Sequence, residues 1–539
     1  MVDPVAAPRC DYRLPNRLTL RVVPGRSHDP VPEPVPAPCH RRIVRTLQGG
    51  PARKTPPSSH FSSMTLQALV SAAPGAVLAR GVGNRLVGRV SDRDDQVGVD
   101  DVFVAIAGAR VDGHDRVAGL DVAAVVVERE VEPRPGVALV RVAATRPVLA
   151  HLSAAALDYP GRTVPTVGIT GTNGKTSTTF LLAAIARAAG LVPGIVGTTG
   201  HFIGDEEIES THTSPSAPVF QGLLARMRDA GVGLCAVEAS SIGLADWRCD
   251  AVPFRAAVFT NLTRDHLDWH GTMEAYAIAK ARLFHELLEG TAVLNAEDPA
   301  VEQMRPRGRP AWTFSTTGPA DLRATPTQTS WAGIEADVRT PRGAGRLALP
   351  LVGQHNLQNA LGALGAALAM GIDLDVALAG LATAAGAPGR LERVPTERGF
   401  AVFVDYAHTD DALTRVLAEL RRLRPHRIIC VFGCGGDRDR GKRPLMGAAV
   451  AAGADVTVLT SDNPRSEDPL SIIADVVAGL GSGARYVEPD RALAIRLALG
   501  LAGPGDVVLI AGKGHERTQE LATGKVPFDD RAVAREVLR

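Results

Sequence analysis

The feature that most constrains this chain is a glycine-rich segment at residues 170–176, which reads Thr-Gly-Thr-Asn-Gly-Lys-Thr. Before it, residues 164–170 are typical of a buried β-strand, and after it residues 177–189 favour a helix. Strand, glycine-rich turn and helix in this order direct backbone N–H groups at a phosphate. Lys175 is expected to reach the terminal phosphates of a nucleotide, and the Thr176 hydroxyl to ligate Mg²⁺. The segment therefore predicts an ATP site, and an ordinary βα turn of small residues is the alternative.

Length, charge and cysteine content exclude several other classes of protein. The 539 residues are enough for about three domains, each with its own core. The chain has 59 basic and 58 acidic residues, so its formal net charge of +1 predicts no nucleic-acid partner. No apolar run approaches the roughly 18 residues of a membrane span. Six scattered cysteines argue against a disulfide scaffold and favour the cytoplasm, and Cys430 and Cys434 are expected to be buried thiols.

Residues 1–63 differ from the rest of the chain. They are rich in Pro and Arg and show neither helical nor strand periodicity. They also lack the apolar core of a secretory signal. Two interpretations stay open: a disordered tail, or a mis-assigned start with Met64 opening the first patterned segment.

Strand and helix patterns beyond residue 63 predict an α/β protein of three domains. A small N-terminal α/β domain is expected at 64–160, with a linker near residues 159–162. Residues 161–386 repeat strand and then helix, which predicts a P-loop ATPase domain with a mostly parallel sheet. Residues 387–539 repeat the pattern and predict a Rossmann-like, doubly wound C-terminal domain.

Polar clusters follow two strands of the central domain. Glu238 ends a predicted strand at 234–238, and an acidic and histidine-containing cluster at 265–268 follows another strand at 256–262. Both clusters are expected on the same edge of the sheet as the phosphate loop, where carboxylate and imidazole suit a second divalent cation. Helix N-capping by Ser240 and by Asp265 is the alternative.

Four further motifs follow strands of the C-terminal domain, at residues 405–408, 433–443, 462–465 and 512–516. The second lacks the glycine spacing of a dinucleotide loop, which argues against a nicotinamide cofactor. The motifs mix Arg and Lys with Asp and Glu. This mixture suits a zwitterionic ligand, since guanidinium groups bind carboxylates and carboxylates bind an ammonium.

Together these motifs resemble the Mur ligase family, whose members build the peptide of the bacterial cell wall by ATP-driven amide formation. The resemblance covers about residues 80–535, and the phosphate loop matches the family's own form. It implies an enzyme of peptidoglycan synthesis that adds meso-diaminopimelate to the D-Glu of UDP-N-acetylmuramoyl-L-alanyl-D-glutamate through an acyl phosphate. ATP is then the co-substrate and Mg²⁺ the cofactor, and the chain is expected to act as a monomer. Members that add lysine lack an arginine at the position of Arg465, because lysine has no second carboxylate.

The resemblance also implies roles for individual residues. Catalysis falls to Lys175, Glu238, His266 and Lys280, of which Lys280 is expected to be carbamylated by CO₂. Metal ligation falls to Thr176, Glu238 and His266. ATP binding falls to Gly171, Thr172, Asn173, Gly174, Lys175, Thr176, Ser177, Asn295 and the hinge residue Arg390. The UDP-muramoyl-dipeptide is assigned to Ala109, Arg110, Val111, Thr213, Ser214, Ser240 and Arg248. Diaminopimelate is assigned to Arg438, Asp462, Asn463, Pro464, Arg465, Gly512 and Glu516.

The sequence departs from the family pattern at several positions. Residues 93–95 read Arg-Asp-Asp where members usually have Asp-Ser-Arg, so the uridine contacts are assigned instead to residues 109–111. Ile242, His355 and Asp410 replace a usual His, Phe and Pro. None of these positions lies in the phosphate loop or in the Asp-Asn-Pro-Arg motif, and activity is expected to survive them.

Two other functions remain as alternatives. One is a related amide ligase, either a lysine-adding Mur ligase or a folylpolyglutamate synthase, against which Arg465 and the 512–516 motif argue. The other is a nucleotide-binding regulatory relative that has lost catalysis. The joint presence of Lys175, Glu238, His266 and Lys280 argues against it.

Overall fold

The computed structural model describes residues 64–108, 111–210, 212–481 and 484–539. They divide into two compact units, with the boundary between Glu392 and Arg393. The tail at 1–63, and Ala109 and Arg110 of the predicted uridine-contact segment, lie outside the described residues. Within the described ranges, no helix combines the length and the apolar character that a membrane crossing requires.

The first unit begins with a five-stranded sheet in the order β2-β7-β6-β5-β4. Neighbours among β4 to β7 run parallel, and β2 lies antiparallel to β7 at the edge. The strands are β2 (Val77–Arg80), β4 (Val90–Ser91), β5 (Val102–Val104), β6 (Ala124–Val127) and β7 (Ala138–Arg141), beside a small pair of β1 (Met64–Thr65) and β3 (Leu86–Val87). Helices α1 (Leu66–Ser71) and α2 (Thr145–Ala156) bury apolar side chains against this sheet.

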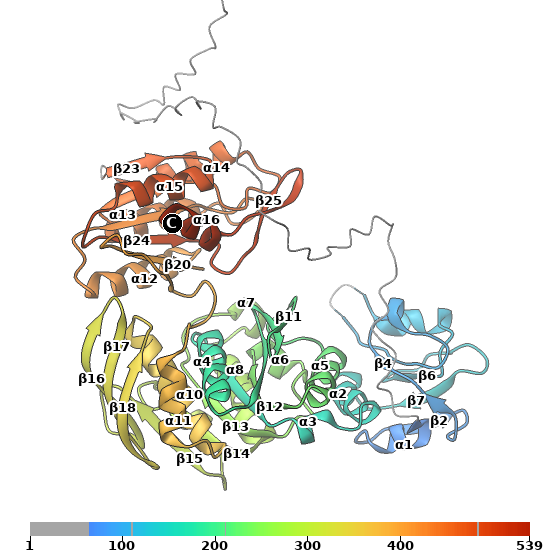
Figure 1. Cartoon of the computed structure of the whole chain (residues 1–539). Helices are drawn as coiled ribbons and strands as arrows, with labels where there is room; N and C mark the ends of the chain where they lie inside the picture. Colours follow the sequence, from blue (N-terminus) through green and yellow to red (C-terminus); the bar gives the residue numbers. More distant parts are fainter. Residues whose placement is uncertain (1–63, 109–110, 211, 482–483) are drawn as a thin grey trace, which may run out of the picture. The chain divides into compact units, whose positions relative to one another are not determined.

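An eleven-stranded sheet forms the core of the rest of this unit, in the order β11-β10-β9-β12-β8-β13-β14-β15-β16-β17-β18. Strands β11 to β18 are labelled in Figure 1. Its parallel centre consists of β9 (Val192–Gly197), β12 (Val232–Glu238), β8 (Thr166–Thr170), β13 (Phe254–Phe259), β14 (Leu288–Asn295) and β15 (Ala311–Ser315). Its antiparallel margins are β10 (Gly200–Ile203) and β11 (Glu206–Ile208) at one side, and β16 (Leu322–Ser330), β17 (Gly333–Thr340) and β18 (Gly343–Leu349) at the other. Strand β16 itself runs parallel to β15.

The strands of the centre are apolar on both faces because helices cover both. Alternate residues point to opposite sides: Val258 belongs to one core cluster and Phe259 to the other. Helices α4 (Lys175–Ala188), α10 (Gln354–Ala369) and α11 (Leu374–Ala382) cover the first face. Helices α5 (Ala217–Asp229) and α8 (Met273–Arg282), with the π-helical turn η3 (Leu283–Leu287), cover the second.

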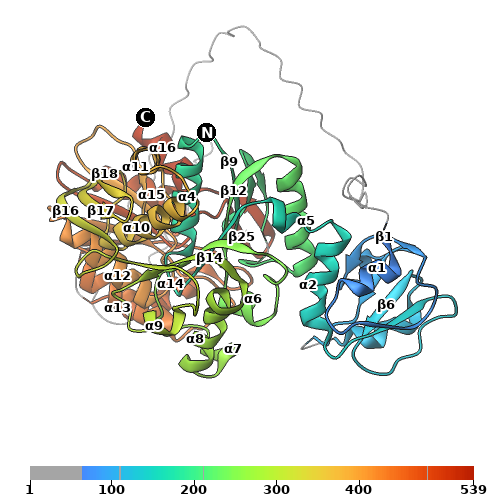
Figure 2. The same cartoon turned by 90° about the horizontal axis from the view of Figure 1, so that it is seen from below.

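The predicted linker near residues 159–162 lies between α2 and the first central strand, β8. It forms a short helix, α3 (Pro160–Thr163), with Pro160 at its first position, where a proline ring suits the helical φ. The turn into it is tight, since Asp158 and Tyr159 both have positive φ. Helices α2 and α5 lie side by side, so the small sheet and the large sheet share an interface inside this unit (Figures 1 and 2).

The second unit is a doubly wound sheet in the order β19-β20-β24-β21-β22-β23. Its strands are β19 (Glu392–Val394), β20 (Ala401–Asp405), β24 (Val507–Ala511), β21 (Ile428–Phe432), β22 (Val456–Leu459) and β23 (Ala484–Val487), followed by a hairpin of β25 (Thr518–Leu521) and β26 (Gly524–Pro527). The helices are α12 (Asp410–Arg422), α13 (Lys442–Gly453), α14 (Pro469–Val477), α15 (Arg491–Leu501) and α16 (Asp530–Leu538). Cys430 and Cys434 are buried thiols, as predicted, and burial raises the pKa of each to about 12.

A fully buried ion pair joins two helices of this second unit. Arg491 of α15 donates from Nε and Nη2 to the two carboxylate oxygens of Asp530, each at 2.7 Å, and both side chains are 0% exposed. The guanidinium also donates to the carbonyls of Ser461 and Ala511, at the ends of β22 and β24. The pair therefore ties the carboxyl edge of the sheet to the last helix.

Asp530→Ala is expected to destabilise the second unit by about 3–5 kcal/mol, because it leaves a buried guanidinium charge without its partner. Amide hydrogen exchange in β21 and β24 measures this change within the intact chain. Glu536→Ala is the matched control, since it removes the exposed partner of Arg496 from the same helix. Equal exchange rates in the two variants would show that the buried pair contributes nothing.

Candidate functional site

The phosphate loop connects β8 to α4, and two lysine amines meet on one of its carbonyl oxygens. Lys175 Nζ donates to the Gly171 and Thr172 carbonyls at 2.8 and 2.9 Å. Lys280 Nζ, from α8 on the other face of the sheet, donates to the same Gly171 oxygen at 2.8 Å. Gly174 precedes α4 with a φ of +88°, a conformation that glycine adopts without strain. Two residues far apart in the sequence therefore converge on the loop.

The surroundings of both amines disfavour their charged forms. Burial lowers the pKa of Lys175, while Glu238 and Asp265 oppose this shift. Lys280 is 1% exposed, and burial followed by the nearby Lys175 charge lowers its pKa well below the usual lysine value. Its Nζ also lies 4.4 Å from the centre of the Tyr276 ring. An amine in this environment is readily available in its neutral, nucleophilic form.

Glu238 lies at the carboxyl end of β12 and contacts the start of α4. Its Oε2 accepts from the Thr176 hydroxyl at 3.1 Å, and its Oε1 accepts from the Thr198 backbone N–H at 2.9 Å. The side chain is buried, at 1% exposed. A carboxylate and a threonine hydroxyl side by side at a phosphate loop are a donor set that Mg²⁺ prefers.

His266 lies apart from this pair. It begins the short helix α7 (Leu267–His270) with a positive φ of +51°, and its side chain is 46% exposed. Its ring lies 3.6 Å from Asp265, and the contacts of the described residues do not join it to Glu238. The capping alternative holds for Ser240, whose hydroxyl accepts from the Gly243 N–H at the start of α6 (Ser241–Ala245). Asp265 caps no helix and accepts from the His266 N–H.

The residues assigned to the muramoyl-dipeptide form one connected group beside Glu238. The Ser214 hydroxyl donates to the Glu238 carbonyl at 2.9 Å and lies 2.9 Å from the Ser240 hydroxyl. Arg248 donates to the Ser214 carbonyl at 3.0 Å. Thr213 lies 2.9 Å from Thr198, hydroxyl to hydroxyl. The structure therefore brings these residues together, whereas Val111 is exposed and its neighbours 109 and 110 are not described.

A cavity of about 500 Å³ opens next to this group, between the small sheet and the large one. Its charged lining includes Arg93, Arg146, Asp246 and Arg248. Asp246 pairs with both Arg146, which belongs to α2, and Arg248, which follows α6. His201 also lines it, and among the described residues its buried Nδ1 has no hydrogen-bond partner.

The other residues assigned to ATP lie close to the loop. Asn295 ends β14 and is buried, and its amide donates to the Thr260 carbonyl at 2.7 Å. Arg390 is near enough for its charge to lower the pKa of Lys175. Asn173 is exposed, and its N–H donates to the side chain of Asn261 at 2.9 Å.

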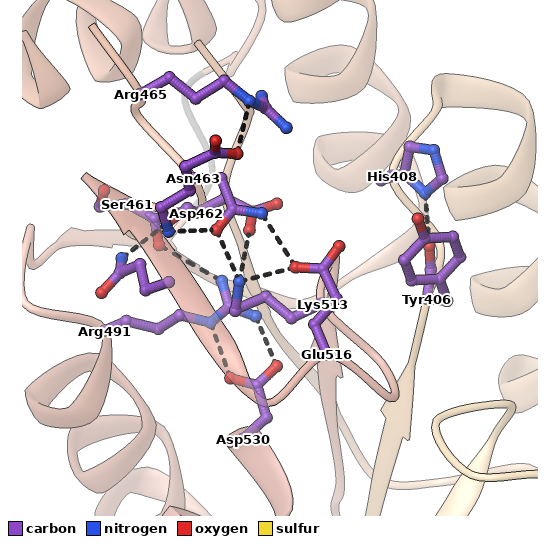
Figure 3. Close-up of polar contacts among 12 residues, drawn as sticks. Tyr406, His408, Ser461, Asp462, Asn463, Arg465, Arg491, Lys513, Glu516 and Asp530 are labelled. Atoms are coloured by element: carbon purple, nitrogen blue, oxygen red, sulfur yellow. Dashed lines mark hydrogen bonds and ion pairs between the residues drawn. The ribbon is translucent and has the colours of Figure 1, made fainter. Parts of the chain in front are cut away.

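In the second unit, the residues assigned to diaminopimelate, with the exception of Arg438, gather at the carboxyl ends of β22 and β24 (Figure 3). Asn463 donates to Glu516 at 2.9 Å. Arg465 donates to Glu520 of β25 at 2.9 Å and to the Gly436 carbonyl at 2.8 Å. Gly512, with a φ of +115°, leaves room for Asp462, because a Cβ there would lie 3.0 Å from the Asp462 carboxylate.

Two further residues assigned to diaminopimelate occupy different surroundings. The Pro464 carbonyl lies against Gly436, where an added Cβ would collide with it. Arg438 is exposed, and none of the contacts in the described ranges joins it to Asp462, Asn463 or Glu516. Arg438 is therefore not part of the buried network at these strand ends.

Three residues that contact the assigned side chains were not singled out by the sequence reasoning. Thr198 donates its hydroxyl to Glu238 at 3.1 Å. It directly follows β9, and a polar residue at the end of a parallel strand could have indicated it. Asp246 joins two arginines, and only the fold brings Arg146 close to it. Lys513 contacts three residues assigned to diaminopimelate, and it lay inside the recognised 512–516 motif.

Two family models match the chain: the Mur ligase middle domain at residues 169–367 and the Mur ligase, glutamate ligase domain at 389–514. The chain is similar to the UDP-N-acetylmuramoyl-L-alanyl-D-glutamate--2,6-diaminopimelate ligase of Gloeobacter violaceus. The identity is 45% over 450 residues, which cover 82% of this chain and 92% of the relative. The ligase of the same name from Geobacillus thermodenitrificans is 40% identical over 489 residues, covering 88% of this chain and 99% of the relative.

Solved structures show the same relationship. A structure of a UDP-N-acetylmuramoyl-L-alanyl-D-glutamate--2,6-diaminopimelate ligase matches with a TM-score of 0.68 at 32% identity, covering 88% of this chain and 99% of that chain. MurF from Acinetobacter baumannii, at 20% identity and a TM-score of 0.56, shares the fold over 86% of this chain and 97% of its own. With both family models and relatives matched over most of its length, this chain belongs to the Mur ligase family.

Proposed function

We propose that this protein is an ATP-dependent amide ligase of peptidoglycan precursor synthesis. It joins meso-diaminopimelate to the D-Glu of UDP-N-acetylmuramoyl-L-alanyl-D-glutamate, the reaction for which its relatives are named. The observation that carries the proposal is the meeting of Lys175 and Lys280 on the Gly171 carbonyl, beside the Glu238–Thr176 pair. The proposed compartment is the cytoplasm, and action as a monomer stays a prediction.

The phosphates of ATP would bind at the N-terminus of α4. Backbone N–H groups of the loop and the helix dipole favour an anion there. Lys175 would exchange its two carbonyl acceptors for phosphate oxygens. These oxygens carry negative charge, which stabilises the Lys175 ammonium as the uncharged carbonyls of the loop do not.

Magnesium fits the pair formed by Thr176 and Glu238. In the described part of the chain, no cluster of three His, Cys, Asp or Glu side chains could hold a metal ion by itself. This suits an ion that takes its other ligands from phosphate and water. Bound there, Mg²⁺ would neutralise charge on the phosphates, and His266 would complete the set only after moving closer to Glu238.

The reaction itself needs two displacements. A carboxylate oxygen of the substrate's D-Glu attacks the γ-phosphorus of ATP, the bond to the bridging oxygen breaks, and ADP leaves. The neutral amine of diaminopimelate then attacks the carbonyl carbon of the acyl phosphate, the bond from that carbon to the phosphate oxygen breaks, and the departing inorganic phosphate carries away the proton that the nitrogen loses as the amide forms. The protein contributes position and charge, and it must exclude water because water would hydrolyse the acyl phosphate.

The choice of amino acid is assigned to the second unit. Arg465 supplies a guanidinium suited to the second carboxylate of diaminopimelate, which lysine lacks. In the structure this guanidinium is held by Glu520 and the Gly436 carbonyl. The buried carboxylate of Asp462 and the partly exposed carboxylate of Glu516 would receive an ammonium group.

The function is tested by ligation with purified full-length protein, ATP, the UDP-muramoyl-dipeptide, and either meso-diaminopimelate or lysine. Tripeptide formation is measured by mass spectrometry and phosphate release by colorimetry. Product is expected with diaminopimelate at a rate at least about tenfold above lysine, the equivalent of one charge-assisted contact. Equal use of lysine would contradict the assignment of the amino acid. No phosphate release with all three substrates present would favour the non-catalytic alternative.

Lys280 is proposed to carry a carbamate formed from its neutral amine and CO₂, which releases a proton. Burial, and then the nearby Lys175 charge, lower the pKa of Lys280 well below the usual lysine value, so the neutral fraction of the amine is larger than for a free lysine and falls as the pH falls. With ¹³C-bicarbonate, a carbamate ¹³C resonance is expected in the native protein and is expected to weaken on acidification.

Lys280→Ala is expected to lose this resonance and nearly all activity, and a short carboxylic acid is expected to restore part of the activity. Lys525→Ala, at an exposed position on β26, is the control. Full activity in the plain Lys280→Ala variant would remove Lys280 from the mechanism.

Gly197 offers a way to move the Glu238 carboxylate without unfolding the sheet. A Cβ at position 197 would collide with Glu238 Oε1, the movable end of a side chain. Gly197→Ala is therefore expected to displace the carboxylate from Thr176 and to lower kcat by about tenfold or more, the scale of a lost charge-assisted hydrogen bond. The thermal midpoint is expected to change little. Gly222→Ala on α5 is the control, since nothing lies within 4 Å of an added Cβ there. Unchanged kcat in Gly197→Ala would separate Glu238 from catalysis.

A further inference from the structure

Lys513 lies between three residues that the proposed function assigns to the amino-acid substrate. Its side chain is 0% exposed. Its Nζ donates to Asn463 Oδ1 and Glu516 Oε2, each at 2.8 Å, and lies 3.6 Å from Asp462 Oδ1 (Figure 3). A fully buried ammonium is costly unless neighbouring groups pair with it and accept its hydrogen bonds, and these three side chains meet that need.

The first consequence concerns the orientation of the Asn463 amide. Its Oδ1 accepts from Lys513 and from the Glu520 backbone N–H at 3.0 Å. The amide oxygen must face these two donors, so the amide nitrogen faces Glu516 and donates to it at 2.9 Å. Together with the Glu520 N–H, Lys513 therefore fixes the orientation of the Asn463 amide.

The second consequence concerns the charge of Glu516. Burial by itself raises the pKa of this carboxyl, and the Lys513 hydrogen bond and charge, with Asn463, outweigh it, so that the pKa lies below its usual value. The side chain is 30% exposed, and one of its oxygens takes both donors. Glu516 is thereby kept ionised while part of it remains open to a ligand.

The third consequence concerns the sum of charges around the site. Arg491 is balanced by Asp530 and Arg465 by Glu520, which leaves Asp462, Glu516 and Lys513. Burial raises the pKa of Asp462, and the charges of Arg491 and Lys513 oppose this shift. With both carboxylates ionised, they and the ammonium sum to one negative charge, which a ligand ammonium would neutralise. The Asp462 Oδ1 is buried, and among the described residues it has no hydrogen-bond partner, although it lies within ion-pair distance of Lys513. His515 is the remaining titratable neighbour of Glu516, and its charge also favours the carboxylate.

We propose that Lys513 is a positioning residue for the amino-acid substrate. Its buried charge holds Asn463 in one orientation and keeps Glu516 ionised, so that the site offers one net negative charge to an ammonium group of diaminopimelate. This inference rests on the proposed function. Lys513 would act through Asn463 and Glu516, which it contacts, and not by touching the substrate itself.

The test compares Lys513→Met with Lys525→Met, which removes an exposed lysine from the nearby hairpin. For Lys513→Met, the KM for diaminopimelate is expected to rise by about tenfold or more, with the KM for ATP within about twofold, since only amino-acid contacts lose a charge-assisted bond. The acidic limb of kcat/KM for diaminopimelate is expected to move to higher pH. The sign follows because loss of the lysine charge raises the pKa of Glu516, which then needs a higher pH to ionise.

Each other outcome decides the proposal. An unmoved acidic limb, or a loss of kcat with the KM for every substrate unchanged, would mean that Lys513 serves folding alone and would overturn it. If Lys513→Met does not fold, Lys513→Gln, which keeps a donor but removes the charge, carries the same expectation. Absence of tripeptide with the unaltered protein would instead overturn the proposed function, so the two failures are distinguishable.

Discussion

The arrangement of the first unit depends on the close approach of the phosphate loop to the end of β13. A Cβ at Gly171 would collide with the Thr260 hydroxyl, and that hydroxyl donates to the Asn173 carbonyl. Only glycine permits this approach, and the approach exposes the Gly171 carbonyl to Lys175 and Lys280 together. Moving the loop outward by the width of a methyl group would separate the amines from their shared acceptor.

Much of this arrangement could be predicted from the sequence, because parallel strands leave their polar residues at a common edge. The strand predicted at 234–238 lies within β12, and the one predicted at 256–262 overlaps β13. Glu238 and Thr176 are adjacent because β12 and β8 are neighbours in the sheet. For these two residues, the rule that polar side chains gather at the ends of parallel strands was enough to predict that they lie together.

Other features could not be predicted because they depend on contacts between distant segments. The antiparallel strands β16 to β18 carry no motif. Their alternating polar residues are typical of any exposed strand and do not predict that these strands extend the central sheet. The contact of Arg146 with Asp246 exists only because α2 packs on α5. The partners of Lys513 come from two loops about 50 residues apart. At 159–162, proline and glycine suggested a linker, but they gave no sign of the short helix that forms there. Pro160 occupies its first position, where a helix tolerates proline.

The boundary between Glu392 and Arg393 has a consequence for how such a protein can diverge. The loop around Gly171 belongs to one folding unit, and Arg465 with the Lys513 network belongs to the other. On the proposed assignment of the amino-acid site, substitutions that alter which amino acid is accepted can accumulate in residues 393–539 without disturbing the packing that holds the phosphate loop. Selection can then act on the two units separately, and the proposed ligase can acquire a new acceptor through changes confined to these C-terminal residues.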